Sequence, residues 1–92
     1  MRFQEYDLGL RRSGEIVEVT LRGTEANVQL MDASNLSAFK AGGRHTFFGG
    51  HVRRSPVRLQ VPSAGHWYVV VHLGGASGRV SSSVVVLPGS IG

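Results

Sequence analysis

Six arginine and histidine side chains lie close together in the middle of the chain, within residues 44–58. They are Arg44, His45, His51, Arg53, Arg54 and Arg58, and they are interleaved with Phe47 and Phe48. A guanidinium group binds phosphate or carboxylate through paired hydrogen bonds, and aromatic rings stack on bases or sugars. The segment is therefore a candidate binding site for an anion. The alternative is structural: the phenylalanines belong to a core, and the arginines are solvated residues that protect edge strands from aggregation.

A second candidate binding segment comes directly before the first. In residues 33–43 the two-residue alternation of the neighbouring segments stops, and Asn35 and Lys40 supply polar groups. Long loops on a rigid β-scaffold often carry binding residues. The alternative is that Leu36 and Phe39 cap one end of a core. Asp32 or Ser34 suits the start of a short helix near residues 34–41.

The sequence contains no motif for catalysis or for metal binding. There is no cysteine and no G-x-S-x-G elbow. His66 and His72 would share one face of a strand, but six residues separate them by about 20 Å, so they cannot chelate one ion. We expect both to be edge or surface residues. The sequence thus predicts no metal, no cofactor and no enzymatic activity, with a small hydrolase as an alternative.

Charge is distributed unevenly along the chain. Residues 1–32 carry four arginines and all six acids, whereas residues 33–92 carry six bases, all four histidines and no acid. One interpretation is that the two parts pair across the fold and neutralise each other. The other is that the second part presents a basic face to an anionic partner.

One stretch of the chain, residues 57–73, has the pattern of central β-structure. Apolar residues alternate with polar ones in residues 57–61, and residues 66–73 form a run of valines and aromatics that includes Trp67. The Pro-Ser-Ala-Gly segment between them predicts a turn, so the two strands form a predicted hairpin. Trp67 is expected to lie in the core.

Other segments show the same two-residue period. The predicted strands are residues 3–8, 15–22, 26–32, 44–48, 51–55 and 79–87. Residues 15–22 and 26–32 are expected to form a hairpin, and Gly49-Gly50 is a two-residue turn signal for another. About seven or eight short strands separated by glycine-rich turns predict an antiparallel β-sandwich, jelly-roll-like or a partly open barrel. A chain of 92 residues has room for one such domain, residues 1–92.

Several of these blocks together resemble a small bacterial family known only as a domain of unknown function. The blocks are GEIVEV (residues 14–19), NVQLMD (27–32), RHTFFGG (44–50), RSPVRLQVP (54–62) and GHWYV (65–69). The resemblance covers nearly the whole chain and implies a compact all-β domain. Some relatives precede TIR-type signalling domains, which implies a sensing or adaptor role. It implies no functional residues.

From the sequence we expect a cytoplasmic, non-catalytic binding module that recognises a protein or a small anionic ligand through the basic 33–58 region. Nucleic-acid binding through the same basic face is the alternative. No apolar run approaches the roughly 18–20 residues that span a bilayer. Exposed strand edges could pair two copies, but nothing in the sequence specifies a homo-oligomer.

Overall fold

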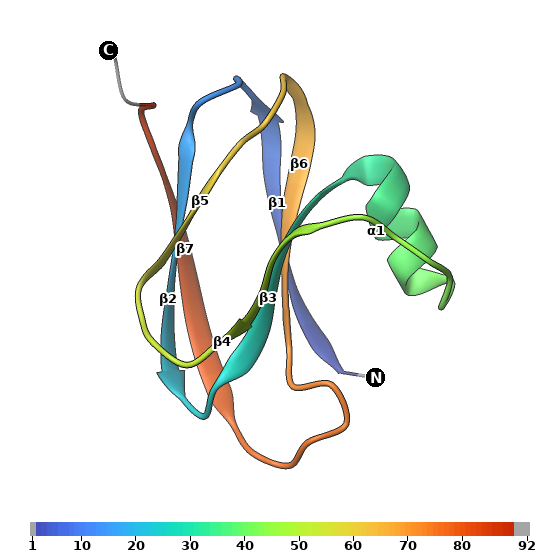
Figure 1. The fold of residues 1–92 in the computed structure, drawn as a ribbon, viewed down its shortest axis with the longest axis vertical. Coiled ribbons are helices and arrows are strands. Elements are labelled where there is room, and N and C mark those ends of the chain that lie inside the picture. The colour runs from blue at the N-terminus through green and yellow to red at the C-terminus, as the bar shows by residue number, and fades with distance from the viewer. Residues whose placement is uncertain (1, 90–92) are drawn as a thin grey trace.

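The computed structural model describes residues 2–89 and shows two antiparallel β-sheets packed face to face, with one helix outside them (Figure 1). The elements are β1 (Phe3–Arg11), β2 (Ile16–Gly23), β3 (Ala26–Asp32), α1 (Ala33–Lys40), β4 (Phe48–Val52), β5 (Val57–Gln60), β6 (Gly65–His72) and β7 (Val80–Leu87). The four-stranded sheet has the order β1-β6-β3-β4, and the three-stranded sheet has the order β5-β2-β7. The predicted β-sandwich with one short helix is confirmed.

The strands pair in a nested order that gives the sandwich a jelly-roll-like winding. β3 pairs with β4, β2 with β5, and β1 with β6, each pair antiparallel. The chain is thus one long hairpin, with β1–β3 as one arm and β4–β6 as the other. Successive strand pairs along this hairpin alternate between the two sheets. β7 then adds to the free side of β2. Because of this winding, the loops at each end of the sandwich come from segments that are far apart in the sequence.

Alternating apolar side chains fill the space between the two sheets. The buried residues of this core are Val17, Val19, Ala26, Val28, Leu30, Val61, Trp67, Val69 and Val71. Trp67 is only 5% exposed, and its indole Nε1–H donates to the carbonyl of Ser63 at 2.8 Å. The prediction that Trp67 lies in the core is confirmed.

Helix α1 covers the outer face of the four-stranded sheet. It begins after Asp32, whose carboxylate accepts a hydrogen bond from the backbone N–H of Asn35 at 3.0 Å. Leu36 then packs against Met31 and Val70. β3 and β6 are therefore covered on both faces, which explains why their sequences are apolar almost throughout.

The helix predicted near residues 34–41 is confirmed as α1, which has eight residues. Within residues 2–89, no helix is long and apolar enough to cross a membrane.

Two predicted hairpins are wrong, because the chain changes sheets at their turns. β5 pairs with β2 in the three-stranded sheet, whereas β6 lies between β1 and β3 in the other sheet. β2 and β3 likewise belong to different sheets. The turns at residues 61–64 and 24–25 therefore connect the two layers instead of reversing the chain within one layer.

The turn predicted at Gly49-Gly50 is also wrong, since both glycines lie inside β4. Gly49 is opposite Gln29 and Gly50 is opposite Val28 in the pairing with β3. Gly49 has φ +117°, and a Cβ atom there would lie 2.2 Å from the Val28 carbonyl oxygen. The glycine permits a close approach between two strands. The strand expected at residues 44–48 is absent, because residues 44–47 have no regular structure.

Candidate functional site

The structure divides the predicted 33–58 binding region among four places. Asn35, Arg44 and His45 line a shallow cleft of about 510 Å³ beside α1, and His51, Arg53 and Arg54 lie at the end of β4 and in the loop after it. Lys40 is the last residue of α1, outside the four-stranded sheet, and Arg58 lies on β5 in the three-stranded sheet. The region separates because the chain crosses from the four-stranded to the three-stranded sheet between β4 and β5. It does not form one basic surface.

In the cleft beside α1, the side chain of Asn35 is already used to hold the fold. Its Nδ2 donates to the Asp32 carboxylate at 2.8 Å, and its Oδ1 accepts from the backbone N–H of Thr46 at 2.7 Å. The hydrogen bond from the Asn35 backbone N–H, and then that from Asn35 Nδ2, lower the pKa of Asp32 below its ordinary value. Arg44 is the one charged residue that lines this cleft.

Acids from the first 32 residues neutralise several of the other candidates. The pairs are Lys40 with Glu5 at 2.8 Å, Arg58 with Glu18 at 2.9 Å, and His51 and Arg53 with Glu25 at 3.1 and 3.5 Å. These surface pairs contribute little stability, but they remove local net charge. For these residues the structure supports the interpretation that the two parts of the chain pair with each other.

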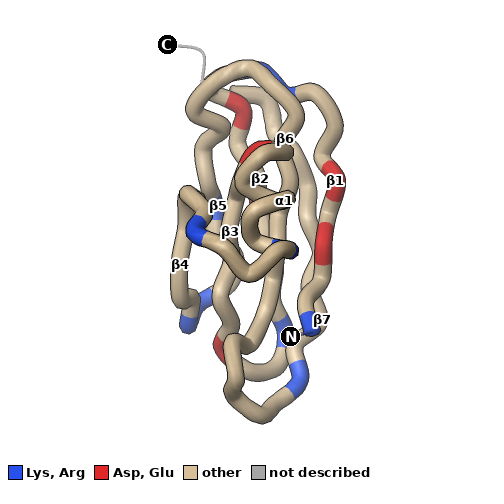
Figure 2. Tube along the Cα trace, turned by 90° about the vertical axis from the view of Figure 1, so that its right-hand side faces the viewer, with Lys and Arg blue, Asp and Glu red and all other residues tan. Residues whose placement is uncertain are grey.

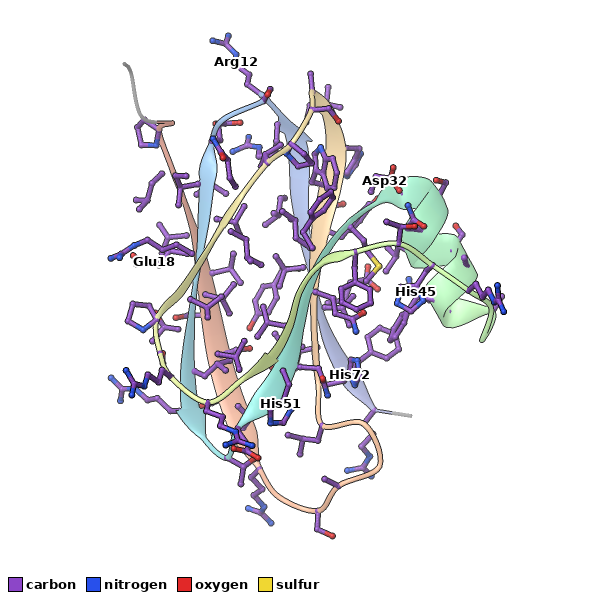
Figure 3. All side chains as sticks on the ribbon, viewed as in Figure 1. Arg12, Glu18, Asp32, His45, His51 and His72 are labelled. Atoms are coloured by element: carbon purple, nitrogen blue, oxygen red, sulfur yellow. The ribbon has the colours of Figure 1, made fainter. Side chains whose placement is uncertain are left out.

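Two histidines belong to an aromatic cluster at the C-terminal end of α1 (Figure 3). The ring centroid of Phe39 lies 5.1 Å from those of Phe3 and His45, and 5.7 Å from that of His72. The His45 Nε2 atom lies 3.0 Å from Oε1 of Gln29. The cluster continues the apolar contact between the helix and the four-stranded sheet.

His72 is buried, so the expectation of an edge or surface residue is wrong. Its side chain is packed at the inner end of the aromatic cluster, and the residue is 9% exposed. Nδ1 accepts a hydrogen bond from the Gly74 backbone N–H at 2.9 Å, which places the ring proton on Nε2. Within the described residues 2–89, that Nε2–H is buried without a hydrogen-bond partner. Burial, and secondarily the charge of His45, lower the pKa of His72 and favour its neutral form.

A carboxylate of β1 and a histidine of β6 also form a pair on the surface. His66 Nε2 lies 2.6 Å from Oδ1 of Asp7, and the His66 ring stacks on Tyr68. The hydrogen bond with His66, and then that from the Gly9 N–H, lower the pKa of Asp7. The described contacts of His66 include no serine or threonine hydroxyl, which a nucleophile–histidine–carboxylate triad requires. Nor do residues 2–89 contain three metal-ligating side chains placed to hold an ion.

The net charge is concentrated at one end of the sandwich. We call this the basic end and define it as residues 2, 22–25, 53–56 and 73–79. Its charged residues are Arg2, Arg22, Arg53, Arg54, Arg79 and Glu25. Five arginines and one glutamate give +4, the formal net charge of the whole chain, because the other five bases and five acids balance. In Figure 2 this appears as blue segments gathered toward the lower end of the tube.

A cavity of about 660 Å³ opens at the basic end, beside the start of β1 and of β7. Its lining comprises Arg2, Phe3, Gln4, Val71, His72, Leu73, Gly78, Arg79 and Val80. No carboxylate of residues 2–89 lies within 4.0 Å of the guanidinium of Arg2 or Arg79. The cavity therefore combines an apolar wall with two cations that no internal acid neutralises.

Close backbone contacts position Arg79 at this cavity. Its carbonyl accepts hydrogen bonds from the Thr24 N–H at 3.0 Å and from the Thr24 hydroxyl at 3.1 Å. Gly23 lets the strands approach, because a Cβ atom there would lie 2.3 Å from the Arg79 carbonyl oxygen. On the other side, Gln4 Nε2 donates to the Val80 carbonyl at 2.9 Å. The cavity rim is thus held by both sheets.

Comparison with known sequences identifies the family. A family model described as Domain of unknown function (DUF1883) matches residues 1–90. The chain belongs to this family. A search of curated proteins and a search of solved structures each found no match. The sequence resemblance to a domain of unknown function is confirmed.

Sequence reasoning missed the cavity residues of the DUF1883 domain. Arg2 and Arg79 are far apart in the chain, and neither has another base within eight residues. His72 looked like one of a pair of surface histidines. The available signal was the excess of arginine over acid in the predicted turns, but using it requires knowing which turns share an end of the sandwich. Only the nested strand order supplies that information.

Proposed function

We propose that this domain is a non-catalytic binding module of the bacterial cytoplasm that recognises a small anionic ligand at its basic end. One observation carries the proposal: the whole net charge lies at the end where the 660 Å³ cavity opens. A cavity of this size is in the range that encloses small molecules. Charges of one sign around a cavity raise the local concentration of the opposite ion and speed its association.

The lining indicates the chemistry of the ligand. Arg2 and Arg79 offer guanidinium groups, which bind the oxygens of a phosphate or carboxylate in pairs. Phe3, Val71 and Leu73 add apolar surface, which suits a ligand with a flat or apolar body. His72 also lines this wall, and its Nε2–H, buried without a hydrogen-bond partner among residues 2–89, is a group that ordinarily has a water or ligand partner. A small molecule with an anionic group attached to such a body fits this lining.

Titration monitored by amide NMR tests the proposal on the full chain. The probes are inorganic pyrophosphate, which has the anion alone, and adenosine triphosphate, which adds a flat ring system. We expect both to shift the amide signals of residues 2–4, 72–74 and 78–80, and the nucleotide to bind more tightly. Since a hydrogen bond to a charged group contributes about 1.5–3 kcal/mol, Arg79→Ala should weaken binding by about 10- to 100-fold.

Arg12→Ala is the matched control. The guanidinium of Arg12 also has no carboxylate within 4.0 Å among residues 2–89, and the side chain points into solvent at the opposite end of the sandwich (Figure 3). It should leave the affinity unchanged. Equal losses from Arg12→Ala and Arg79→Ala, or shifts confined to other surfaces, would refute the proposed site.

Nucleic-acid binding is the second candidate, because the arginines extend past the cavity to Arg53 and Arg54 in the β4–β5 loop. A single-stranded oligonucleotide titrated at several salt concentrations distinguishes the two. Steeply salt-dependent binding that Arg53→Ala and Arg79→Ala weaken alike, without binding of the small probes, would favour nucleic acid. Binding of the small probes with only weak oligonucleotide binding would favour the cavity.

A further inference from the structure

The two sheets have four edge strands, and three of these are protected against pairing with another chain. β1 carries Glu5 and Asp7 and has an irregularity in its pairing after Asp7. β4 has five residues and contains Gly49-Gly50. β5 has four residues, contains Arg58 and lies between two prolines. Charge, brevity, irregular pairing and flanking proline are the usual means of blocking an edge.

β7 is an edge strand with fewer of these protections: Arg79 and Pro88 flank it, but none lies within the strand itself. It pairs with β2 without a break along all eight of its residues, Val80–Leu87, and contains no charge and no proline. Val85 is 49% exposed on its outer face, one of the larger exposed apolar side chains of the domain. A long, uncharged edge of this kind is a template for strand addition.

The hydrogen bonds of β7 show which of its backbone groups face outward. The carbonyls of Val80 and Ser82 accept from the side chains of Gln4 and Tyr6 on β1, so the even-numbered residues face away from β2. Because strand residues alternate, Val84 and Val86 face the same way. Val80 and Ser82 therefore have partners, whereas the outward N–H and C=O groups of Val84 and Val86 have none within residues 2–89.

We propose that β7 pairs antiparallel with the β7 strand of a second copy of this chain. With Val85 opposite its own counterpart, Val84 of each copy faces Val86 of the other, and the four unpaired N–H and C=O groups of each copy are satisfied. The two exposed Val85 side chains then meet on the outer face. The product is a continuous six-stranded sheet with a twofold axis, which closes the assembly at two copies.

Charge favours a second copy as the occupant of this edge. An uncharged strand meets its own copy without repulsion, whereas an edge built for a different partner has no need to be self-complementary. β7 begins at Val80, at the basic end, and ends at Leu87, at the opposite end. Antiparallel pairing thus places the two +4 ends at opposite ends of the dimer. This inference is independent of the proposed ligand.

Sedimentation equilibrium of the full chain over a range of concentrations tests the dimer. We expect a monomer–dimer equilibrium for the wild type, and at least about tenfold weaker association for Val85→Lys, which places two like charges at the axis. Ser81→Lys is the matched control, since Ser81 is exposed on the same face of β7 but lies outside the paired segment. It should leave the association unchanged. Circular dichroism verifies that both variants are folded.

A second measurement needs no variant. Amide hydrogen exchange of Val84 and Val86 in the wild type should slow as protein concentration rises, while the exchange of residues at the free edge of β4 should not change. A monomer at all concentrations, a dimer that Val85→Lys leaves intact, or exchange at Val84 and Val86 that is independent of concentration would each overturn the inference.

Discussion

Replacing Trp67 by alanine is expected to remove a large part of the stability of the domain. The side chain is 5% exposed within the core between the sheets, and truncating such a residue costs about 3–5 kcal/mol. A domain of 92 residues has a free energy of unfolding of roughly 5–14 kcal/mol at about 0.05–0.15 kcal/mol per residue. Trp67→Ala should therefore remove at least about a fifth of the stability. If the stability lies at the lower end of this range, the substitution removes nearly all of it.

Trp67→Phe separates the packing from the hydrogen bond. It keeps much of the ring volume but loses the bond from Nε1 to the Ser63 carbonyl, which contributes about 1 kcal/mol. Because Ser63 is exposed and its carbonyl can bind water instead, we expect a total loss of about 1–2 kcal/mol. Urea unfolding followed by far-ultraviolet circular dichroism measures both variants, since the only tryptophan has been removed. A loss below about 1 kcal/mol for Trp67→Ala at an unchanged m-value would refute the packing argument.

Three further predictions concern the helix, the buried histidine and the cavity rim. Asp32→Ala removes the helix cap and should lower the free energy of unfolding by about 1 kcal/mol, measured by thermal melts. This difference should shrink as the pH falls from 3.8 through the lower folded pKa of Asp32, because the carboxylate is then protonated in the wild type. The pKa of His72 is lowered on folding, so the unfolded chain binds more protons and the wild type should lose stability as the pH falls from 6.5 toward the lower folded pKa. His72→Phe should flatten that part of the pH–stability curve, and an unchanged slope would contradict the assignment. Gly23→Ala should cost about 1–3 kcal/mol and displace Arg79, because its Cβ would meet the Arg79 carbonyl at a φ of +109°; wild-type stability with unchanged amide shifts at Arg79 would show that the contact is dispensable.

The sequence predicted local structure well, because local structure depends on the spacing of apolar residues. The alternation around Val17 and Val19 identified β2, and the apolar run around Trp67 identified β6. The helix at residues 34–41 followed from the loss of that alternation after Asp32. In the two strands the apolar residues that produce the pattern are buried, so there the pattern reports the packing directly.

Strand pairing was not predicted correctly, because a turn signal does not say which sheet the next strand enters. Gly23 and the Pro62–Gly65 segment reverse the chain as their composition indicates, but the reversal leads from one layer to the other. Gly49-Gly50 gave a false signal, since Gly49 is required by the close approach of β4 to the Val28 carbonyl. A glycine needed for close packing and a glycine needed for a turn look the same in one sequence.

The predicted binding region does not form one surface, for a related reason. Proximity in the sequence grouped Arg44 with Arg58, but Arg44 lies in the irregular segment beside α1, whereas Arg58 lies on β5 of the three-stranded sheet. The arginines that do share one end of the fold are distributed over four segments, with Arg2 and Arg79 at the extremes. The nested pairing brings such segments together, because two strands that are far apart in the sequence lie side by side and their flanking loops then lie at the same end of the sandwich.

The charge at the basic end is best understood together with the pairing of charges elsewhere. Every acid outside that end accepts from a base or a helix N–H, as Asp7 does from His66 and Asp32 from Asn35. At the basic end a single Glu25 serves His51 and Arg53, and the other four arginines have no acid within 4.0 Å among residues 2–89. Like charges held together oppose folding by mutual repulsion, and a bound anion relieves that repulsion. If an anion binds at the basic end as proposed, it should therefore raise the stability of the domain.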